Sequence, residues 1–201
     1  MIWQHDKELI LASKSQARQN LLKEAGLAFA SIPASIDERA VNLRHRHEAV
    51  ADQALMLART KALAVSVLYP DQWVIGSDQM LDCEGEVLHQ VGNRLEAMAQ
   101  IQALNGRLHR LTSALYLVFA GRVEAELHDV ATLQMRYWST RDFERYLDEV
   151  GETVFGSVGC YHIETEGARL FGRIEGSRST IMGMPMDPLL VLLQQKGLIG
   201  R

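Results

Sequence analysis

The stretch at residues 9–22 constrains the fold more than any other part of the chain. Its first residues, Leu9–Ala12, form a short apolar run without a helical period, which predicts a buried strand. A Ser-x-Ser turn follows, and after it Leu21, Leu22 and Ala25 recur with the helical period. A strand that passes through a tight turn into a helix is a basic unit of α/β folds, so the stretch predicts that class.

The turn of this unit is unusually rich in polar groups. Two hydroxyls and two cations lie close together in it: Ser13, Lys14, Ser15 and Arg18. Ser15 alone would be explained as the residue that caps the helix N-terminus. Hydroxyls and cations beside the free N–H groups and the positive end of a helix dipole also make a site for an anion. Capping and phosphate binding are therefore both open interpretations of this turn.

Length and composition narrow the class of protein. The chain has 201 residues, of which 47% are apolar and 23% charged, enough for one α/β domain with a substantial core. A net charge of −4 argues against non-specific binding to nucleic acid. No apolar run is long enough to cross a membrane, and residues 1–8 lack the apolar core of a signal peptide. We therefore expect a cytoplasmic protein without nucleic-acid or membrane partners. Cys83 and Cys160 are far apart, which favours buried thiols over a disulfide or a zinc site.

Predicted strands and helices alternate along the whole chain. After the first unit, the predicted strands or extended segments are Leu27–Ile32, Trp73–Gly76, Met80–Cys83, His109–Phe119, Val123–Arg136 and Ala168–Ile174. The predicted later helices are Glu48–Leu68, Arg94–Leu104, Thr140–Glu149 and Met186–Lys196. No linker or repeat separates these elements. We expect a single domain, residues 1–201, of the α/β class: a mixed twisted sheet with helices on both faces and two interwoven lobes around a central cleft.

Three segments outside the first turn carry candidate site residues. Asp78 follows the predicted strand directly and could hold Mg²⁺ or activate a water, although it could equally be a turn aspartate. Asp37 and Glu38 are adjacent acids in a predicted loop, where they could bind Mg²⁺ or merely be solvated. Lys61 interrupts the apolar face of the predicted long helix, so it should reach an anion or extend to solvent.

The segment from Cys160 to Ser177 is dense in polar residues and glycine. If it lines a cleft, Glu164 and backbone groups of this segment could read a nucleotide base. A plain hairpin and turn would explain the same composition nearly as well.

Taken in order, these segments resemble the Maf family of nucleoside triphosphate pyrophosphatases. The resemblance runs from Leu9 to about Leu193. The opening residues Leu9–Arg18 look like the family's LILAS-x-S-x-x-R pattern. The other similar segments are Ile36–Glu38, Lys61–Ala62, Val74–Gln79, Leu104–His109, Arg173–Gly176 and Met182–Pro185.

The resemblance implies a reaction, a metal and a set of roles. Members of the family hydrolyse a nucleoside triphosphate between the α- and β-phosphates with Mg²⁺ or Mn²⁺, and the resemblance implies a homodimer. Carried over to this chain, the catalytic residues would be Asp78, Lys61 and Glu38, with Glu38 and Asp78 also holding the metal. The substrate-binding residues would be Ser13, Ser15, Arg18, Gln79 and Glu164.

Two departures from the family pattern bear on activity. The opening motif often has two arginines, whereas this chain has Gln16-Ala17-Arg18. The family's GKP motif is replaced by His89-Gln90-Val91, so a lysine is lost. Losing a charge that faces a phosphate costs about 2–4 kcal/mol of transition-state stabilisation in comparable sites. An alternative function is therefore a catalytically weakened nucleotide-binding regulator. The resemblance to the family suggests a link of such a regulator to cell division or septum formation.

The resemblance also favours one branch of the family. The run Ser77-Asp78-Gln79 together with Glu164 is similar to the branch that prefers 7-methyl-GTP. The branch that prefers dTTP or UTP tends to have ADT and a glutamine at these places. A carboxylate suits a methylated, cationic guanine, because it can accept N–H bonds and oppose the positive charge.

Overall fold

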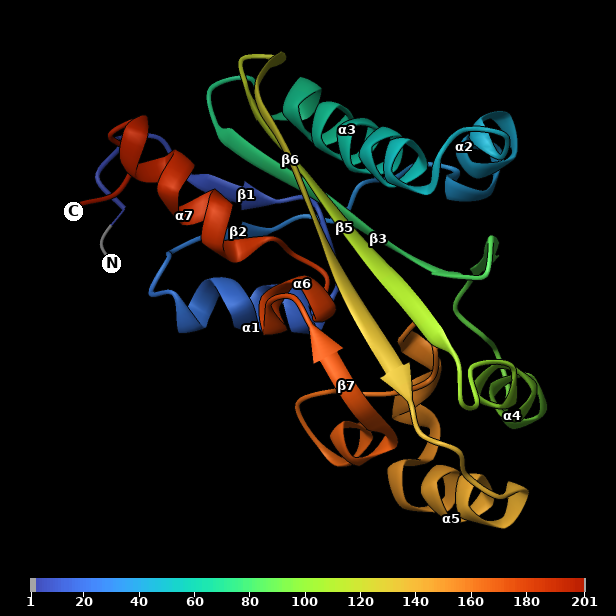
Figure 1. The fold of residues 1–201 in the computed structure, drawn as a ribbon. Helices are drawn as coiled ribbons and strands as arrows, with labels where there is room; N and C mark the ends of the chain where they lie inside the picture. The colour runs from blue at the N-terminus through green and yellow to red at the C-terminus, as the bar shows by residue number, and fades with distance from the viewer. Residues whose placement is uncertain (1–2, 201) are drawn as a thin grey trace.

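The computed structural model describes residues 3–200, which form a seven-stranded mixed sheet with helices packed against it (Figure 1). The strand order is β2-β1-β3-β5-β6-β7, and β4 pairs with β3. The strands are β1 (Leu9–Leu11), β2 (Ala30–Ser31), β3 (Trp73–Cys83), β4 (Glu86–Leu88), β5 (Leu108–Phe119), β6 (Arg122–Met135) and β7 (Phe171–Glu175). The α-helices are α1 (Gln16–Glu24), α2 (Glu38–His45), α3 (Val50–Leu68), α4 (Arg94–Ala103), α5 (Thr140–Val150), α6 (Arg178–Ile181) and α7 (Met186–Gln195). Two 3₁₀ helices, η1 (Gly151–Gly156) and η2 (Glu166–Leu170), complete the elements. The predicted mixed α/β class is confirmed.

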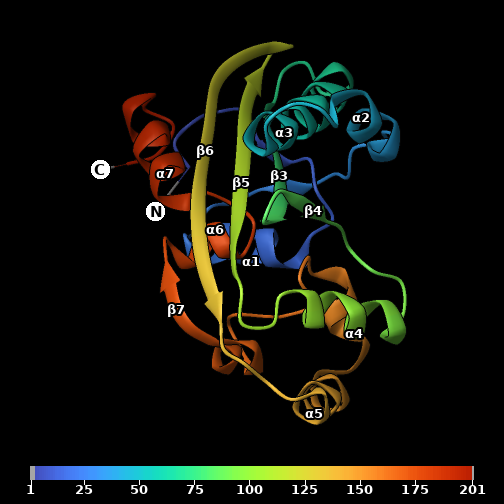
Figure 2. The same ribbon diagram turned by 45° about the vertical axis from the view of Figure 1, so that its right-hand side comes forward.

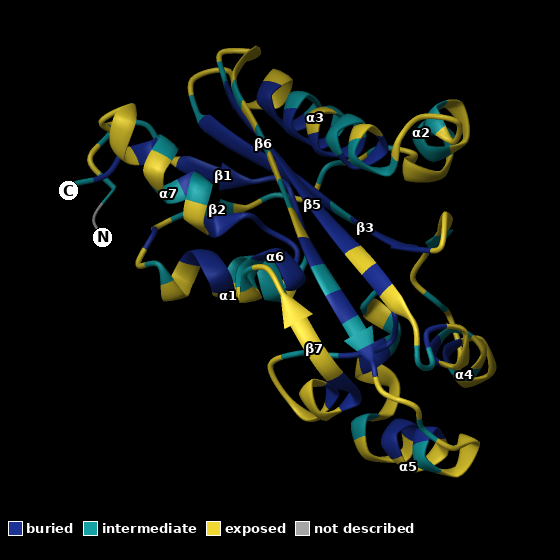
Figure 3. Ribbon diagram, in the orientation of Figure 1, coloured by how far each residue is buried: buried dark blue, intermediate teal, exposed yellow. Residues whose placement is uncertain are grey.

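Helices cover both faces of the sheet around β1. Successive side chains of a strand point to opposite faces. Leu9 and Leu11 pack with Leu22 of α1 and Leu189 of α7, whereas Ile10 packs with Leu57 of α3 on the other face. Because both faces are covered, β1 is buried along its whole length (Figure 3). The prediction of helices on both faces is confirmed.

A separate apolar core lies at the far end of the long strands. It gathers residues of β3, β5 and β6 against α4 and α5, among them Leu81, Leu111, Leu133, Ile101 and Phe143. Figures 1 and 2 show β5 and β6 running as one long hairpin from the end near α3 to the end near α4 and α5. The same strands therefore contribute to the cores at both ends of the molecule.

β3 changes its neighbour along one edge, and this change prepares the site. Its first part, Trp73–Ile75, pairs in parallel with β1, and its last part, Leu81–Cys83, pairs antiparallel with β4. On the other edge β5 pairs with it continuously from Trp73 to Asp82. Among the described residues, the positions between Ile75 and Leu81 have no ladder partner on the first edge. Asp78 lies in the middle of this open interval.

Some predicted boundaries are wrong, and two of them concern the site. Asp78 does not end a strand, because antiparallel pairing with β5 continues to Asp82 and pairing with β4 includes Cys83. Glu38 does not lie in a loop: it is the first residue of α2, and Asp37 caps that helix by accepting a hydrogen bond from Ala40 N at 3.0 Å. Apolar periodicity gives no sign of α2, since none of its residues is buried.

Other differences are smaller. The predicted strand Leu27–Ile32 shrinks to β2, and Ala168–Ile174 divides into part of η2 and β7. The short α6 has no counterpart among the predicted helices. A tight turn at Glu84-Gly85, with positive φ at both residues, joins β3 to β4. Within the described residues, no helix is both long and apolar enough to cross a membrane.

Candidate functional site

Lys61 joins two carboxylates at the open interval of β3. Its Nζ donates to Asp78 Oδ1 at 2.6 Å and to Glu38 Oε2 at 2.9 Å. The three side chains come from α3, β3 and the first turn of α2. Of the two interpretations of Lys61, the structure therefore supports contact with an anion over extension to solvent, and Glu38 contributes a second carboxylate although its local structure differs from the prediction.

The three charges differ in burial. The side chains of Lys61 and Asp78 are 9% and 10% exposed, whereas that of Glu38 is 52% exposed. Burial raises the pKa of Asp78, while the nearby cations of Lys61 and Arg18 act in the opposite direction. Charges deep in a protein are costly without partners, which explains why the buried groups Lys61 and Asp78 are in direct contact. Glu38 forms the solvent-exposed side of the site.

Arg18 is held in place from two directions. Its Nε donates to the carbonyl oxygen of Gly183 at 2.9 Å, and its Nη1 donates to Ser13 Oγ at 3.3 Å. Burial lowers its pKa, and the negative charges of Asp78 and Glu38 oppose that effect. Arg18 is thus a half-buried cation close to both carboxylates.

The two serines organise the turn before α1. Ser15 caps the helix by accepting a hydrogen bond from Arg18 N at 3.4 Å, and Ser13 Oγ accepts one from Ser15 N at 3.2 Å. The first turn of α1 contains no acidic residue. The capping interpretation of Ser15 is therefore confirmed, and the positive end of the helix still faces Ser13 and Arg18. A polyanion could bind at this end.

Gln79 and Glu164 have different surroundings from the other candidates. The side-chain nitrogen of Gln79 donates to the carbonyl oxygens of Thr180 at 2.8 Å and Ile181 at 2.9 Å. Glu164 lies exposed in the turn before η2 and makes no hydrogen bond or ion pair within the described residues. The structure therefore connects Gln79 with the end of α6. Glu164 lies apart from the cluster of Lys61, Asp78 and Glu38, called the Lys61 cluster below.

Sequence reasoning missed the part played by the segment after α6. The carbonyl oxygen of Gly183 accepts from Arg18 and also lies 3.0 Å from Ser77 Oγ, whose single O–H is shared with the Ala114 carbonyl oxygen at 2.8 Å. A carbonyl group has no signature in a sequence. The available signal was the glycine itself, which adopts a φ of 103° that other residues rarely take.

Two residues of the family motifs have structural partners. Gln90, which replaces the family's lysine, is exposed and donates to the carbonyl oxygen of Gly156 at 2.7 Å. His109 lies in the core near α4 and α5, where its Nε2 is 2.9 Å from Tyr161 Oη. Within these contacts, neither side chain joins the Lys61 cluster.

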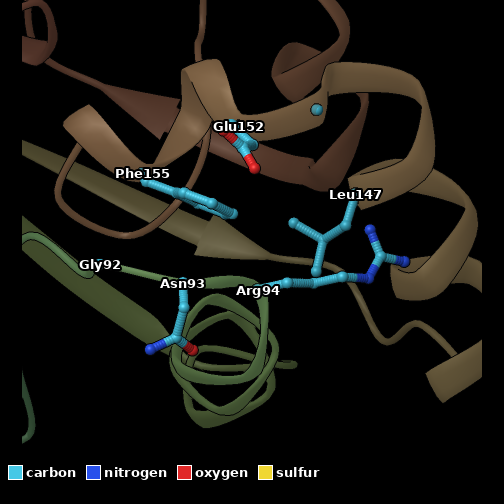
Figure 4. A pocket seen from close by; sticks show the side chains of 7 residues that line it. Gly92, Asn93, Arg94, Leu147, Glu152 and Phe155 are labelled. Atoms are coloured by element: carbon cyan, nitrogen blue, oxygen red, sulfur yellow. The ribbon is translucent and has the colours of Figure 1, made fainter.

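A hollow of about 330 Å³ lies elsewhere, between the start of α4 and η1 (Figure 4). Figure 4 shows Leu147 and Phe155 facing it from the side of α5 and η1, with Arg94 across from them. The hollow shares no lining residue with the candidate site. It therefore does not extend the Lys61 cluster.

Three comparisons relate the chain to known proteins. A family model described as Maf-like protein matches residues 8–196. A nucleoside triphosphate pyrophosphatase from Nitrobacter hamburgensis is 42% identical over 199 residues, with 99% of this chain and 98% of that protein covered. A 7-methyl-GTP pyrophosphatase from Rhizobium johnstonii is 44% identical over 197 residues, with 96% of this chain and 98% of that protein covered. A solved nucleoside-triphosphatase / dITP/XTP pyrophosphatase from Mycobacterium abscessus aligns at a TM-score of 0.45 and 13% identity, with 96% and 98% covered.

The fold and the site define an α/β protein in which a strand–turn–helix unit lies beside a lysine-bridged pair of carboxylates. With a family match over nearly the whole chain and relatives above 40% identity, the protein belongs to the Maf family.

Proposed function

We propose that the protein is a nucleoside triphosphate pyrophosphatase, which releases a monophosphate and pyrophosphate by cleaving between the α- and β-phosphates. The observation that carries the proposal is the meeting of Arg18, Lys61, Glu38 and Asp78 from four separate elements. A triphosphate brings several negative charges, and more charge develops on the phosphates during hydrolysis, so fixed cations at this place stabilise the transition state. The names of the relatives support the same activity.

Each side chain has a role that follows from its position. Ser13, Ser15 and Arg18 bind phosphate oxygens at the start of α1, where N–H groups and the helix dipole favour an anion. Lys61 offsets phosphate charge. Asp78 accepts the proton of the attacking water, and burial suits it to this role by raising its pKa toward the working pH.

Mg²⁺ or Mn²⁺ is the metal that the donor set fits. The carboxylates of Glu38 and Asp78 already share one cationic group, Lys61 Nζ, and carboxylate oxygens are the ligands that these ions prefer. No group of three or more His, Cys, Asp or Glu side chains placed to hold a metal occurs in residues 3–200. Glu38 and Asp78 would therefore hold the ion together with phosphate and water oxygens, as Mg²⁺ commonly requires. The bound ion would supply further neutralisation of phosphate charge.

The preferred base is proposed to be 7-methylguanine. The free, exposed carboxylate of Glu164 can accept N–H bonds from guanine and oppose the charge of its methylated ring. A relative named 7-methyl-GTP pyrophosphatase supports this choice.

A nucleotide screen tests the activity and the base together. Pyrophosphate release is measured for 7-methyl-GTP, GTP, dTTP and UTP, each with Mg²⁺, with Mn²⁺ and with a chelator. We expect metal-dependent release that is fastest with 7-methyl-GTP. Faster release from dTTP or UTP would contradict the proposed base. Tight nucleotide binding without release from any nucleotide would contradict the activity and favour the regulator, whose motivation is the neutral Gln90.

Two further proposals rest on the resemblance to the family: the protein acts as a homodimer, and it acts in the cytoplasm. Size-exclusion chromatography with light scattering tests the first, with twice the chain mass of 22.5 kDa as the expected result. Cell fractionation tests the second, with the protein expected in the cytoplasmic fraction.

A further inference from the structure

The backbone carbonyls at the end of α6 are where the site and the C-terminal part of the chain meet. The last carbonyls of a helix lack partners inside the helix, so other groups must satisfy them. Side chains from three other elements do so here. The contacts are Ser113 Oγ to Thr180 O at 2.7 Å, Gln79 Nε2 to Thr180 O at 2.8 Å and to Ile181 O at 2.9 Å, Ser77 Oγ to Gly183 O at 3.0 Å, and Arg18 Nε to Gly183 O at 2.9 Å. The Ser77 hydroxyl shares its one hydrogen between Gly183 O and Ala114 O, which lies at 2.8 Å, so it ties the Gly183 carbonyl to β5 as well as to β3.

These partners fix the orientation of the Gln79 side chain. Two of them are carbonyl oxygens, which can only accept hydrogen bonds, so the amide nitrogen must face the end of α6. The nitrogen also lies 3.2 Å from Ser113 Oγ. Its donor capacity is thus used entirely by the protein.

Gly183 connects the end of α6 to Arg18, because its carbonyl oxygen accepts a hydrogen bond from Arg18 Nε. A Cβ atom at Gly183 would lie 3.3 Å from Arg18 Nε and 3.7 Å from Gln79 Oε1, so a glycine allows this close approach. The Gly183 carbonyl and Ser13 Oγ hold the guanidinium from two directions. The remaining N–H groups of the five on an arginine are then presented in a fixed orientation.

Ser77 and Gln79 flank Asp78 on β3. Because side chains alternate along a strand, Ser77 and Gln79 face residues 180–183 while Asp78 faces Lys61 on α3. One short run of β3 therefore places Asp78 directly and places Arg18 through Gly183.

We propose that Ser77 and Gln79 are positioning residues of the phosphate site: they hold residues 180–183 against β3, so that the Gly183 carbonyl fixes the Arg18 guanidinium. This inference rests on the proposed binding of a triphosphate. It predicts that replacing Gln79 lowers the affinity for every phosphate ligand, whatever its base. A residue that contacts the base would instead affect some nucleotides and not others.

Binding of inorganic tripolyphosphate, a ligand without a base, tests the proposal by calorimetry. Gln79→Met and Ser77→Ala each remove a hydrogen-bond donor to residues 180–183, and each is expected to weaken tripolyphosphate binding by about tenfold. The affinities for 7-methyl-GTP and UTP should fall by a similar factor. When Arg18 is already replaced by Met, adding Gln79→Met should change affinity by less than about twofold, because the two residues act as one unit.

The matched control is Ser66→Ala. Like Ser77, Ser66 is a fully buried serine, at 1% exposure. Its Oγ accepts a hydrogen bond from Gly121 N at 3.1 Å, away from the site. This variant should lose thermal stability but keep its affinity. Unchanged tripolyphosphate affinity in both site variants would overturn the proposal, as would a loss confined to one nucleotide or an equal loss in Ser66→Ala.

The result separates this inference from the proposed activity. If tripolyphosphate binding follows the expected pattern but no nucleotide releases pyrophosphate, the positioning role stands and the activity fails. If Gln79→Met does not fold, Ser77→Ala still tests the positioning role, through its own affinity and through its coupling to Arg18→Met.

Discussion

At the residue scale, the site depends on one ammonium group that two carboxylates share. Lys61 and Asp78 are buried and in contact, whereas Glu38 reaches the same ammonium from the solvent side. A buried ion pair costs desolvation of both partners, so it is retained where its charges act on a ligand or fix a geometry. Three substitutions follow from this arrangement.

Asp78→Asn should separate binding from chemistry. The change keeps the shape of the side chain and removes its charge, so pyrophosphate release should fall by roughly 10²–10⁴-fold, the range for a positioned acid–base group. Nucleotide affinity should fall much less than the rate, because the serines, Arg18 and the second metal-binding carboxylate, Glu38, remain. Glu38→Gln is the comparison, with a smaller loss expected from its half-exposed carboxylate. Release at the parent rate in Asp78→Asn would show that this mechanism is wrong.

Lys61→Met should destabilise the fold at neutral pH. Removing one partner of a buried pair costs about 3–5 kcal/mol in the free energy of unfolding, which urea titration measures. Asp78 already has a raised pKa in the folded protein, and losing Lys61 raises it further. A raised carboxyl pKa costs stability above that pKa and nothing at low pH, so the deficit should shrink as the pH falls.

The double variant Lys61→Met/Asp78→Asn is the control for that prediction. It leaves no unpaired carboxylate at position 78, so it should recover much of the lost stability and show a weaker pH dependence. A deficit in Lys61→Met that is independent of pH would point to packing alone.

At the element scale, the close contact between α3 and β3 sets the distance from Lys61 to Asp78. Gly76 makes this contact possible, because a Cβ atom there would lie 2.2 Å from the carbonyl oxygen of Ala58 and 2.5 Å from the backbone nitrogen of Ala62. Both of these atoms belong to the backbone of α3 and cannot rotate away. The helix that carries Lys61 is therefore seated on the strand that carries Asp78.

Gly76→Ala should push α3 away from β3. Overpacking of this kind costs about 1–3 kcal/mol of stability, and more where backbone must move. Pyrophosphate release should also fall, because Lys61 moves with its helix. Gly156→Ala is the control, since a Cβ atom at Gly156 has no neighbour within 4 Å. Equal stability of the two variants by thermal unfolding would contradict the conclusion that Gly76 is needed for the close contact between α3 and β3.

At the scale of the whole molecule, β3, β5 and β6 join the cores at the two ends. His109 belongs to β5 and is only 1% exposed in the core with α4 and α5. Burial lowers the pKa of His109 from its usual 6.5 to about 4. The folded protein thus holds a neutral histidine that the unfolded chain would protonate in mild acid.

This histidine should make stability depend on pH. Because its pKa is lower in the folded state, its contribution is full above pH 6.5 and is lost as the pH falls toward 4. The total loss is about 3 kcal/mol, since each pKa unit corresponds to about 1.4 kcal/mol. Urea unfolding of the parent and of His109→Gln between pH 7.5 and 4.5 measures it. The variant should lose less stability over this range, and an identical pH dependence in both would exclude His109 as its source.

The sequence alone was sufficient to predict those elements whose stabilising interactions join residues close together in the chain. The strand and helix around Ser15 were predictable because the cap, the turn and the apolar period all lie within a few residues. The capping box of Ser139 and Asp142 and the hairpin between β5 and β6 are local in the same way. The identity of most candidate residues also came from the sequence, through their resemblance to ordered family motifs.

Tertiary structure decided what depends on distant partners. Asp78 lies within a long strand because β5, a distant part of the chain, pairs with it at Ala114 and continues the pairing to Asp82. Arg18 is oriented by a carbonyl 165 positions away, which no side-chain pattern reveals. The helix that carries Glu38 has no buried residues, so the periodicity of apolar residues could not predict it. Sequence patterns record the preferences of neighbouring residues, whereas pairing, burial and ion contacts depend on which distant segments the folded chain brings together.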